Sequence, residues 1–493
     1  MTYTILDCYT DEPSGLGVPP YLGVYPRYIY GYIRTGGSDT SQINHSLGDA
    51  YYLTIDDLRL FKKYDLKVPE VKKSGKTNIS IYNLSKNYDD IERILKKTKV
   101  LIVILGVHTP GKYLSARPGT LKEIKELIRD LNCKKILTGP AVYGTSVEGG
   151  RFFEKTSLDI FDEIKNFNFS YDEVSKYCLK GAEVIKQIDK LRIIEIETSR
   201  GCKRGKGCSF CTEPLKSKFE HRTAKDVFDE VKKFYDLGVR YFRIGKQSCF
   251  YSYPEASKLI KSIREQLKVK VLHIDNVNPV FVNEKLTKDI VKYCTEGNVA
   301  AFGVESFDEK VIKENNLNCN SKDVLRAVKI INKYGSKRGA NGMPYFLPGI
   351  NLLYGLKGES KNTFIKNFEY LKSILDSNLL LRRINIRKVV LFEGTELYNK
   401  VGNKFLRKNR RYYYSATKKI REEIDFEMLK KIVPKGVILK DLRTEIYDGN
   451  TTFCRQLGTY PLIVGVKGRI KLDTFINIKI KDWMLRSVVG ERV

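Results

Sequence analysis

Short apolar strands alternate with amphipathic helical segments over most of the chain, and this alternation restricts the chain to parallel α/β folds. Strands that are joined by helices pair in parallel and are covered on both faces. The alternation runs from residue 1 to 170 and restarts at 191. We therefore predict a doubly wound sheet at 1–170, with its ligand at the carboxyl edge of the strands. Its expected strands are 3–7, 50–55, 100–105 and 135–138, with helical patterns at 90–97 and 121–131.

The second alternating region predicts a separate barrel. Residues 171–190 are expected to form a helical connector, and residues 191–398 a (β/α)6 partial barrel. Residues 399–436 form a basic connector, and turn signals in 437–493 predict a small antiparallel β-domain. The expected barrel strands are 192–197, 240–245, 270–275, 299–304, 350–355 and 385–391, separated by helices such as 223–237, 255–267 and 322–334.

Charge and composition narrow the partner class. Lys plus Arg total 88 against 58 for Asp plus Glu, a net charge of +30, which favours a polyanionic partner. No apolar stretch is long enough to span a membrane and no signal peptide is visible, so no membrane association is expected. The ten cysteines are too few for a disulfide scaffold, and we expect a reducing, cytoplasmic location.

Three cysteines cluster on one loop, Cys202, Cys208 and Cys211, directly after the strand expected at 192–197. Three thiolates can hold three irons of a [4Fe–4S] cluster and leave the fourth iron open for chemistry. Structural zinc is an alternative, but it needs a fourth ligand such as His221. Burial of the cysteines in a core is a third reading, which the polar, Gly-rich flanking residues disfavour.

At this motif the chain resembles the radical SAM superfamily, over about residues 190–400. The strand that feeds Ser-Arg-Gly-Cys202, and the segments 239–247, 300–308, 351–359 and 389–395, are similar to the cluster loop and later strands of that family. The resemblance implies a [4Fe–4S] cluster, S-adenosylmethionine (SAM) and an external electron donor. The open iron would chelate SAM, and one electron would cleave it to a radical that abstracts hydrogen from the substrate.

The resemblance also assigns SAM contacts to particular residues. Phe210 would pack on the adenine, or simply in a core. Glu305 would face the cofactor, or join a structural ion pair. Two departures are evident: the spacing is C-x5-C-x2-C where the family has C-x3-C-x2-C, and Gly245-Lys246-Gln247 replaces Gly-Gly-Glu. The remaining expected contacts are Gly245, Lys246 and Gln247 at the methionyl amino group, Asn276 at the ribose, and Arg387 as a carboxylate clamp or a packed surface residue.

The N-terminal region resembles the cobalamin-binding-type domain that precedes many radical SAM barrels. His108-Thr-Pro-Gly111 matches half of the usual Asp-x-His-x-x-Gly motif, but Gly106 replaces the Asp that would orient the histidine. Whether cobalamin binds is therefore left open. The architecture is also related to tRNA methylthiotransferases. Because only Cys8 and Cys133 precede residue 150, the second cluster that sulfur insertion needs is not expected.

The C-terminal region resembles a TRAM-like RNA-binding barrel. Residues 400–421 hold nine Lys or Arg and no acid, and Arg410, Arg411, Tyr413 and Trp483 are candidate RNA contacts. A solvated basic helix and a capping β-domain are the structural alternatives. We expect a radical SAM enzyme that modifies RNA, above all tRNA, by methylation or a related reaction. A cobalamin-type enzyme acting on a small metabolite, lipid precursor or peptide is the alternative, and a non-catalytic RNA-binding iron–sulfur protein is a third.

Overall fold

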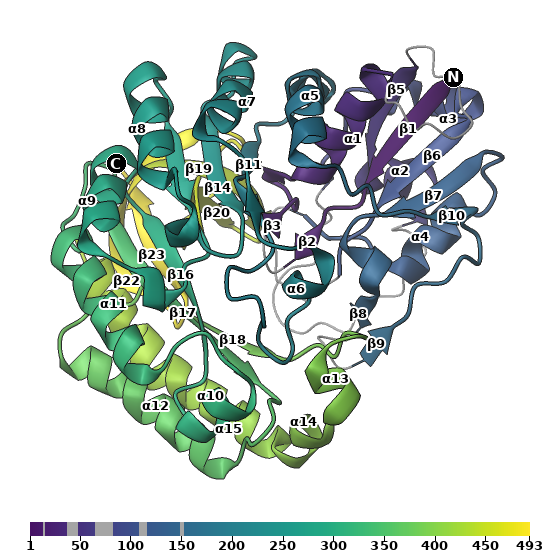
Figure 1. Cartoon of the computed structure of the whole chain (residues 1–493). Helices are drawn as coiled ribbons and strands as arrows, with labels where there is room; N and C mark the ends of the chain where they lie inside the picture. Colours follow the sequence, from purple (N-terminus) through teal and green to yellow (C-terminus); the bar gives the residue numbers. More distant parts are fainter. Residues whose placement is uncertain (13–14, 37–47, 65–81, 108–115, 148–151) are drawn as a thin grey trace. The chain divides into compact units, whose positions relative to one another are not determined.

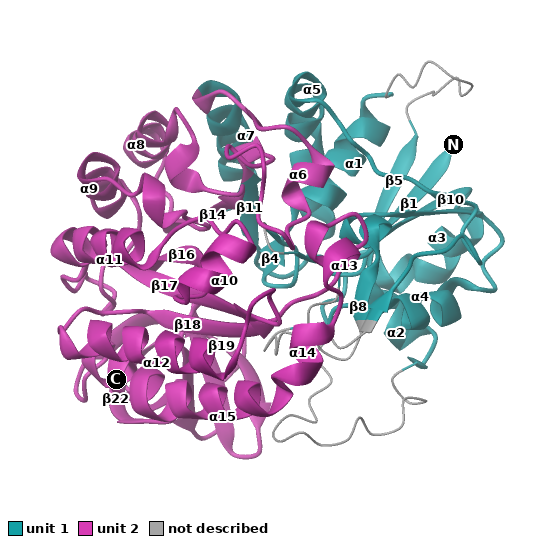
Figure 2. Cartoon of the chain, turned by 60° about the horizontal axis from the view of Figure 1, so that its bottom comes forward, with its two compact units in different colours: residues 1–196, 225–240 teal, residues 197–224, 241–493 magenta. Residues whose placement is uncertain are grey.

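A computed structural model of the chain describes residues 1–12, 15–36, 48–64, 82–107, 116–147 and 152–493. The chain forms two compact units (Figure 2). The first holds residues 1–196 and 225–240, and the second holds residues 197–224 and 241–493. No described helix is both long and apolar enough to span a membrane.

The first unit contains a five-stranded parallel sheet (Figure 1). The strand order β10-β7-β6-β1-β5 reverses between β1 and β6, which places the topological switch point there. All five residues of β6 are buried, as expected for a central strand with helices on both faces. This confirms the predicted doubly wound sheet. Its strands are β1 (Thr2–Asp7), β5 (Asp49–Thr54), β6 (Val100–Ile104), β7 (Lys134–Thr138) and β10 (Glu163–Ile164), and its helices include α1 (Val24–Arg34), α2 (Ile55–Phe61), α3 (Ile91–Lys97), α4 (Leu121–Ile128) and α5 (Tyr171–Gly181).

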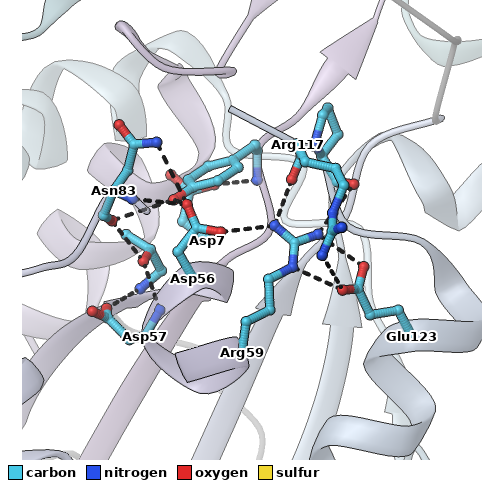
Figure 3. Close-up of polar contacts among 10 residues, drawn as sticks. Asp7, Asp56, Asp57, Arg59, Asn83, Arg117 and Glu123 are labelled. Carbon is cyan, nitrogen blue, oxygen red and sulfur yellow. Dashed lines mark hydrogen bonds and ion pairs between the residues drawn. The ribbon is translucent and has the colours of Figure 1, made fainter. Parts of the chain in front are cut away.

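A buried polar network lies beyond the carboxyl ends of β1 and β5 (Figure 3). The Arg59 guanidinium pairs with Asp56 at 2.8 Å and with Glu123 at 2.7 Å. Asp57 closes a capping box with Thr54, which begins α2. Burial raises the pKa of Asp7 to about 6, although Tyr9 N and Tyr52 OH donate to it. The network fixes the loops that follow the two strands.

The first unit also contains the start of the second alternating region. Strand β11 (Ile193–Glu197) pairs in parallel with the short β4 (Tyr21–Leu22). Arg27 of α1 forms a fully buried ion pair with Glu230 of α7 (Ala224–Asp236) and donates to the Glu195 carbonyl. Burial of both charges makes this pair expensive to break. The strand and helix that begin the predicted barrel are thus held by the N-terminal segment.

The second unit contains the remaining parallel strands of the β/α core. Strand β14 pairs with β15, and β16, β17 and β18 form a three-stranded parallel sheet. In β16–β18, Val304, Ile350 and Ile386 are buried on one face, whereas Asn351 and Asn385 on the other face are partly exposed. One face therefore packs under helices and the other is open near the carboxyl ends. The strands are β14 (Tyr241–Lys246), β15 (Val271–Ile274), β16 (Asn298–Glu305), β17 (Phe346–Tyr354) and β18 (Arg383–Lys388), and the helices include α8 (Ala256–Gln266), α9 (Glu284–Tyr293), α10 (Glu309–Glu314), α11 (Ser321–Gly335) and α12 (Lys361–Asp376).

A closed five-stranded barrel ends the chain, which confirms the predicted small β-domain. Its strands are ordered β19-β20-β21-β23-β22. They span β19 (Ile438–Asp448), β20 (Thr451–Gln456), β21 (Ile463–Lys467), β22 (Phe475–Trp483) and β23 (Ser487–Arg492).

The loop between β20 and β21 joins this barrel to the parallel core. Thr459 N donates to His273 Nδ1 at 2.9 Å, and Tyr460 OH donates to Asp275 at 2.9 Å. The Arg383 guanidinium lies 3.7 Å from the centre of the Tyr460 ring. Burial lowers the pKa of His273 to about 4, so its ring is the neutral acceptor that Thr459 requires. The loop thus ties β15 and β18 together.

The basic connector is helical. It comprises α13 (Glu396–Lys400), α14 (Lys404–Lys408), α15 (Arg410–Ile420), a π-helical turn at Arg421–Asp425 and α16 (Phe426–Ile432). Tyr412 and Tyr413 contact Phe364 and Tyr354, whereas Tyr414 is 54% exposed. The helices therefore pack on the core through aromatic side chains and leave most of their cations facing solvent.

Candidate active site

The three clustered cysteines lie on the irregular loop that follows β11. The loop turns at its cysteines: Gly205 N donates to the Cys202 carbonyl and Cys211 N to the Cys208 carbonyl. All three are free and partly exposed. Burial, with added repulsion from Glu213 and the other two thiols, raises the pKa of Cys211 to about 12. The thiols are thus close enough to interact, and a bound metal would deprotonate them.

The segment after α10 holds the cluster loop in place. Ser209 N donates to the Asn315 carbonyl at 2.9 Å, and Ser209 Oγ donates to Asn315 Oδ1 at 2.8 Å. The Asn316 amide donates to the carbonyls of Lys206 and Gly207 at 3.0 and 2.9 Å. Arg204 donates to the Asn316 carbonyl at 3.0 Å and lies 3.5 Å from Cys208 Sγ. These contacts fix the loop between the first two cysteines.

The donor set fits an iron–sulfur cluster better than zinc. In a [4Fe–4S] cluster each thiolate binds a different iron, so its ligands need not converge on one point. Within the described residues, no three His, Cys, Asp or Glu side chains are arranged to hold a single metal ion. His221, which the zinc alternative needs as a fourth ligand, is exposed, and its Nδ1 lies 3.2 Å from the Arg222 carbonyl. Cys202, Cys208 and Cys211 would therefore hold the cluster.

Glu305 and Arg387 lie near the carboxyl ends of β16 and β18 and interact electrostatically. Glu305 ends β16 at a β-bulge, with a φ of +67°, a backbone conformation that a non-glycine residue adopts at a cost. Burial raises its pKa to about 8, and the Arg387 charge opposes that rise. Glu305 in turn contributes to the raised pKa of Cys208, after burial as the main cause. The structure thus brings three predicted site residues, Cys208, Glu305 and Arg387, within electrostatic range.

The side chains of Gln247 and Asn276 form hydrogen bonds that connect the carboxyl ends of β14 and β15. The Gln247 amide donates to the carbonyls of Ile244 and Asp275, both at 2.9 Å. The Asn276 amide donates to the carbonyls of Gly245 and Gln247 at 3.1 and 3.0 Å. The amide hydrogens of both side chains are therefore used within the protein. Lys246 is partly exposed and contributes, after Arg200, to the lowered pKa of the buried Glu197.

Phe210 lies in an apolar cluster beside the cysteine loop. The cluster consists of Val311, Leu317, Leu356, Val389 and Leu397, with Phe210, Cys208 and Leu353 packed against it. The aromatic residue of the motif thus anchors the loop to the second unit.

Two asparagines on the open face of the sheet were not identified from the sequence. Asn351 and Asn385 are register partners on β17 and β18, and Gly303 is the partner of Asn351 on β16. A TIM-like barrel interior is normally filled by bulky branched residues. Here one layer holds a glycine and two carboxamides, which leaves room and hydrogen-bonding groups for a polar ligand. The sequence feature that could have identified them is an asparagine in the middle of each apolar strand.

The candidate RNA contacts fall into two groups. Arg410 and Arg411 are exposed on α15. Tyr413 packs edge-to-face on Tyr354, with ring centres 5.7 Å apart. Trp483 is partly buried and donates its Nε1–H to the Val433 carbonyl at 2.8 Å. The two arginines face solvent, whereas the two aromatic rings are engaged by the protein.

Comparison with known proteins identifies the family. Residues 196–371 match the description "Radical SAM superfamily". The chain belongs to the radical SAM superfamily. It is therefore a radical SAM enzyme, with a [4Fe–4S] cluster and SAM as cofactors and a requirement for an electron donor.

Whole-chain relatives and solved structures are also similar. An uncharacterized protein of Methanocaldococcus jannaschii is 42% identical over 542 positions, covering 99% of this chain and 93% of the relative. Another protein of that organism, provisionally named a methylthiotransferase, is 23% identical over 63% of this chain and 66% of its own length. The radical SAM methyltransferase TsrM from Kitasatospora setae, solved with cobalamin and a [4Fe–4S] cluster, has a TM-score of 0.51 at 12% identity. That match covers 81% of this chain and 77% of the TsrM chain, and it shows the shared fold.

Proposed function

We propose that this radical SAM enzyme modifies RNA, above all tRNA, by methylation. The observation that carries the proposal is a set of cations on α14 and α15 that form no ion pair with any described carboxylate. A chain with a net charge of +30 favours polyanions in general, but neutralised surface lysines bind phosphate poorly. Cations without acidic partners are therefore the ones that indicate where a phosphate backbone could bind.

The nine Lys and Arg residues at 400–421 divide into paired and unpaired residues. Lys400 pairs with Glu396, Lys418 with Glu422 and Arg421 with Asp425. Six others are exposed and form no ion pair with any described residue. They are Lys404, Arg407, Lys408, Arg410, Arg411 and Lys419. This arrangement supports a track for the phosphate backbone.

Different residues of the second unit would have different roles in the reaction. Cys202, Cys208 and Cys211 would hold the cluster, and Glu305 with Arg387 would orient SAM. When bound, the cluster and SAM would supply a radical that abstracts hydrogen from the target carbon; a second SAM would supply the methyl group and leave as S-adenosylhomocysteine, with one further electron from the donor. Asn351 and Asn385 would hydrogen-bond the target nucleotide, because each carboxamide presents both a donor and an acceptor. The face that carries them would also have to exclude water while the radical exists.

Salt-dependent tRNA binding tests the proposal. Each phosphate contact adds about 0.9 to the magnitude of the slope of log K against log salt on duplex regions, and about 0.7 on single strands. The variant Lys408→Ala/Arg410→Ala/Arg411→Ala should therefore flatten the slope by about 2 to 3. The matched control, Lys261→Ala/Lys268→Ala/Lys285→Ala, removes three exposed lysines from the region of α8 and α9 and should leave the slope unchanged. Equal slopes for both variants would remove the support for an RNA substrate.

The TsrM comparison favours a second candidate, a cobalamin-type enzyme that acts on a small molecule. In this chain cobalamin would lie at the switch point between β1 and β6. There Val107 N donates to the Asp11 carbonyl at 3.2 Å, and a Cβ on Gly106 would approach Asp11 N to 2.5 Å. Gly106 and Asp11 are thus packed closely at this edge, and His108 lies outside the described residues. Stoichiometric retention of hydroxocobalamin through gel filtration, without tRNA binding, would favour the second candidate.

A further inference from the structure

A pocket of about 470 Å³ opens beside the cluster loop in the second unit. It combines three parts of the chain: the cluster loop, α10 with the residues after it, and the turn after β17. Glu396 of α13 completes the wall. The lining residues are Lys206, Lys310, Lys313, Glu314, Asn315, Asn316, Lys357 and Glu396.

Two consecutive hydrogen bonds, both made by Arg204, connect the pocket wall to Cys208. Asn316, in its wall, accepts at its carbonyl from Arg204, whose guanidinium lies 3.5 Å from Cys208 Sγ. Asn315, also in the wall, holds the backbone N–H of Ser209. A molecule seated here would therefore contact groups bonded to the loop that carries the iron.

One of the pocket lysines, Lys206, lies in the longer segment between the first two cysteines. The chain has five residues between Cys202 and Cys208 where the family has three, and Lys206 lies among those five. Asn316 holds the Lys206 and Gly207 carbonyls, which fixes this part of the loop against α10. The departure from the family spacing thus places a lysine at the mouth of the pocket.

The charge of the pocket is positive. Four lysines against two glutamates give 4 − 2 = +2 for the lining. Glu396 pairs with Lys400 at 3.0 Å, and Glu314 lies 4.0 Å from Lys357. Lys206, Lys310 and Lys313 are exposed and form no ion pair with any described residue. Three cations are therefore available to an acidic partner.

We propose that this pocket is the docking site of the electron donor, a small acidic electron-transfer protein with an iron–sulfur or flavin centre. One electron would leave the donor's reduced centre, which is oxidised by one electron, and enter the cluster, which is reduced by one. Electron transfer requires proximity to the cluster, and the pocket wall is bonded to the cluster loop. Phosphate binding has no such requirement, so the location favours the protein donor over RNA. Complementary charge would speed encounter and make it salt-dependent. This inference rests on radical SAM chemistry and not on the RNA substrate.

The test compares protein and chemical reduction of the reconstituted holoenzyme. The variant Lys310→Glu/Lys313→Glu reverses two charges on α10 without altering the cysteine loop, and Lys206→Glu is a second, independent variant. The matched control is Lys261→Glu/Lys268→Glu in the α8 region, far from α10 in Figure 1. The rate of 5′-deoxyadenosine formation is measured with an acidic [4Fe–4S] ferredoxin and with dithionite. The dissociation constant of the oxidised ferredoxin is measured separately as a function of salt.

The ratio of the ferredoxin-supported to the dithionite-supported rate decides the outcome. We expect this ratio to fall about tenfold or more in both pocket variants, and the ferredoxin dissociation constant to rise in parallel. The control should match the wild type. An unchanged ratio and dissociation constant would overturn the proposal, as would weakened tRNA binding with an unchanged ratio. No 5′-deoxyadenosine with dithionite in the wild-type enzyme would instead contradict the radical SAM activity itself.

Discussion

Asn315→Ala should release the cluster loop. The Asn315 side chain is fully buried and makes four hydrogen bonds. Two involve the Lys357 backbone, one the Val311 carbonyl and one Ser209 Oγ. At about 1 kcal/mol net for each hydrogen bond, the substitution should cost about 4 kcal/mol. Because Ser209 lies between Cys208 and Cys211, part of this loss falls on the loop that would hold the iron.

The assay measures iron and sulfide per chain after anaerobic reconstitution, and the half-life of the cluster absorbance under a chelator. Asn332→Ala is the matched control: Asn332 is buried on α11 and makes three side-chain hydrogen bonds, to Val328 and Leu380. We expect both variants to unfold at lower denaturant concentration, but only Asn315→Ala to lose iron faster. Equal cluster half-lives in the two variants would refute the assigned role of Asn315.

Two further perturbations test the packing of each unit. Glu230→Gln leaves the Arg27 charge buried without its partner, and should destabilise the first unit by about 3 to 5 kcal/mol in denaturant unfolding; a cost below about 1 kcal/mol would contradict the buried pair. The pKa of His273 is about 4 in the folded protein and 6.5 in the unfolded chain. As the pH drops, the unfolded chain therefore binds the proton first, and the free energy of unfolding falls between pH 6.5 and 4. The loss should reach about 3 kcal/mol, at 1.36 kcal/mol for each pH unit. His273→Gln should remove this part of the pH dependence, and an identical pH profile in the variant would contradict the neutral, Thr459-bound ring.

Local sequence patterns predicted the strands well where apolar residues alternate or run together. Strand β17 begins at Phe346, four residues before the predicted start at 350, because Pro348 and Gly349 weaken the strand signal although both residues pair in the sheet. Strand β18 covers 383–388 where 385–391 was expected. Arg383 lies before the expected start of the strand, and its guanidinium stacks on Tyr460, a contact that a local pattern cannot reveal.

The cysteine loop could be recognised because its three cysteines are close together in the sequence, whereas the residues that support the loop could not. Asn315 and Asn316 contact the loop from more than 100 residues away in the chain. The two-residue strand β4 follows Pro19 and Pro20 and becomes a strand only through its pairing with Ile193 and Ile194. The pairing of Asn351 with Asn385 likewise depends on the register of two strands joined by a helix. Long-range contacts of this kind build the site, and a short stretch of sequence does not reveal them.

The most direct test of the proposed activity is nucleoside mass spectrometry of tRNA incubated with the reconstituted enzyme, SAM and dithionite. The account predicts that a methylated nucleoside forms in step with 5′-deoxyadenosine, and that both are lost when Cys202, Cys208 and Cys211 are replaced by alanine. SAM cleavage that proceeds at the same rate with and without tRNA, and leaves every nucleoside unchanged, would contradict the proposed RNA substrate.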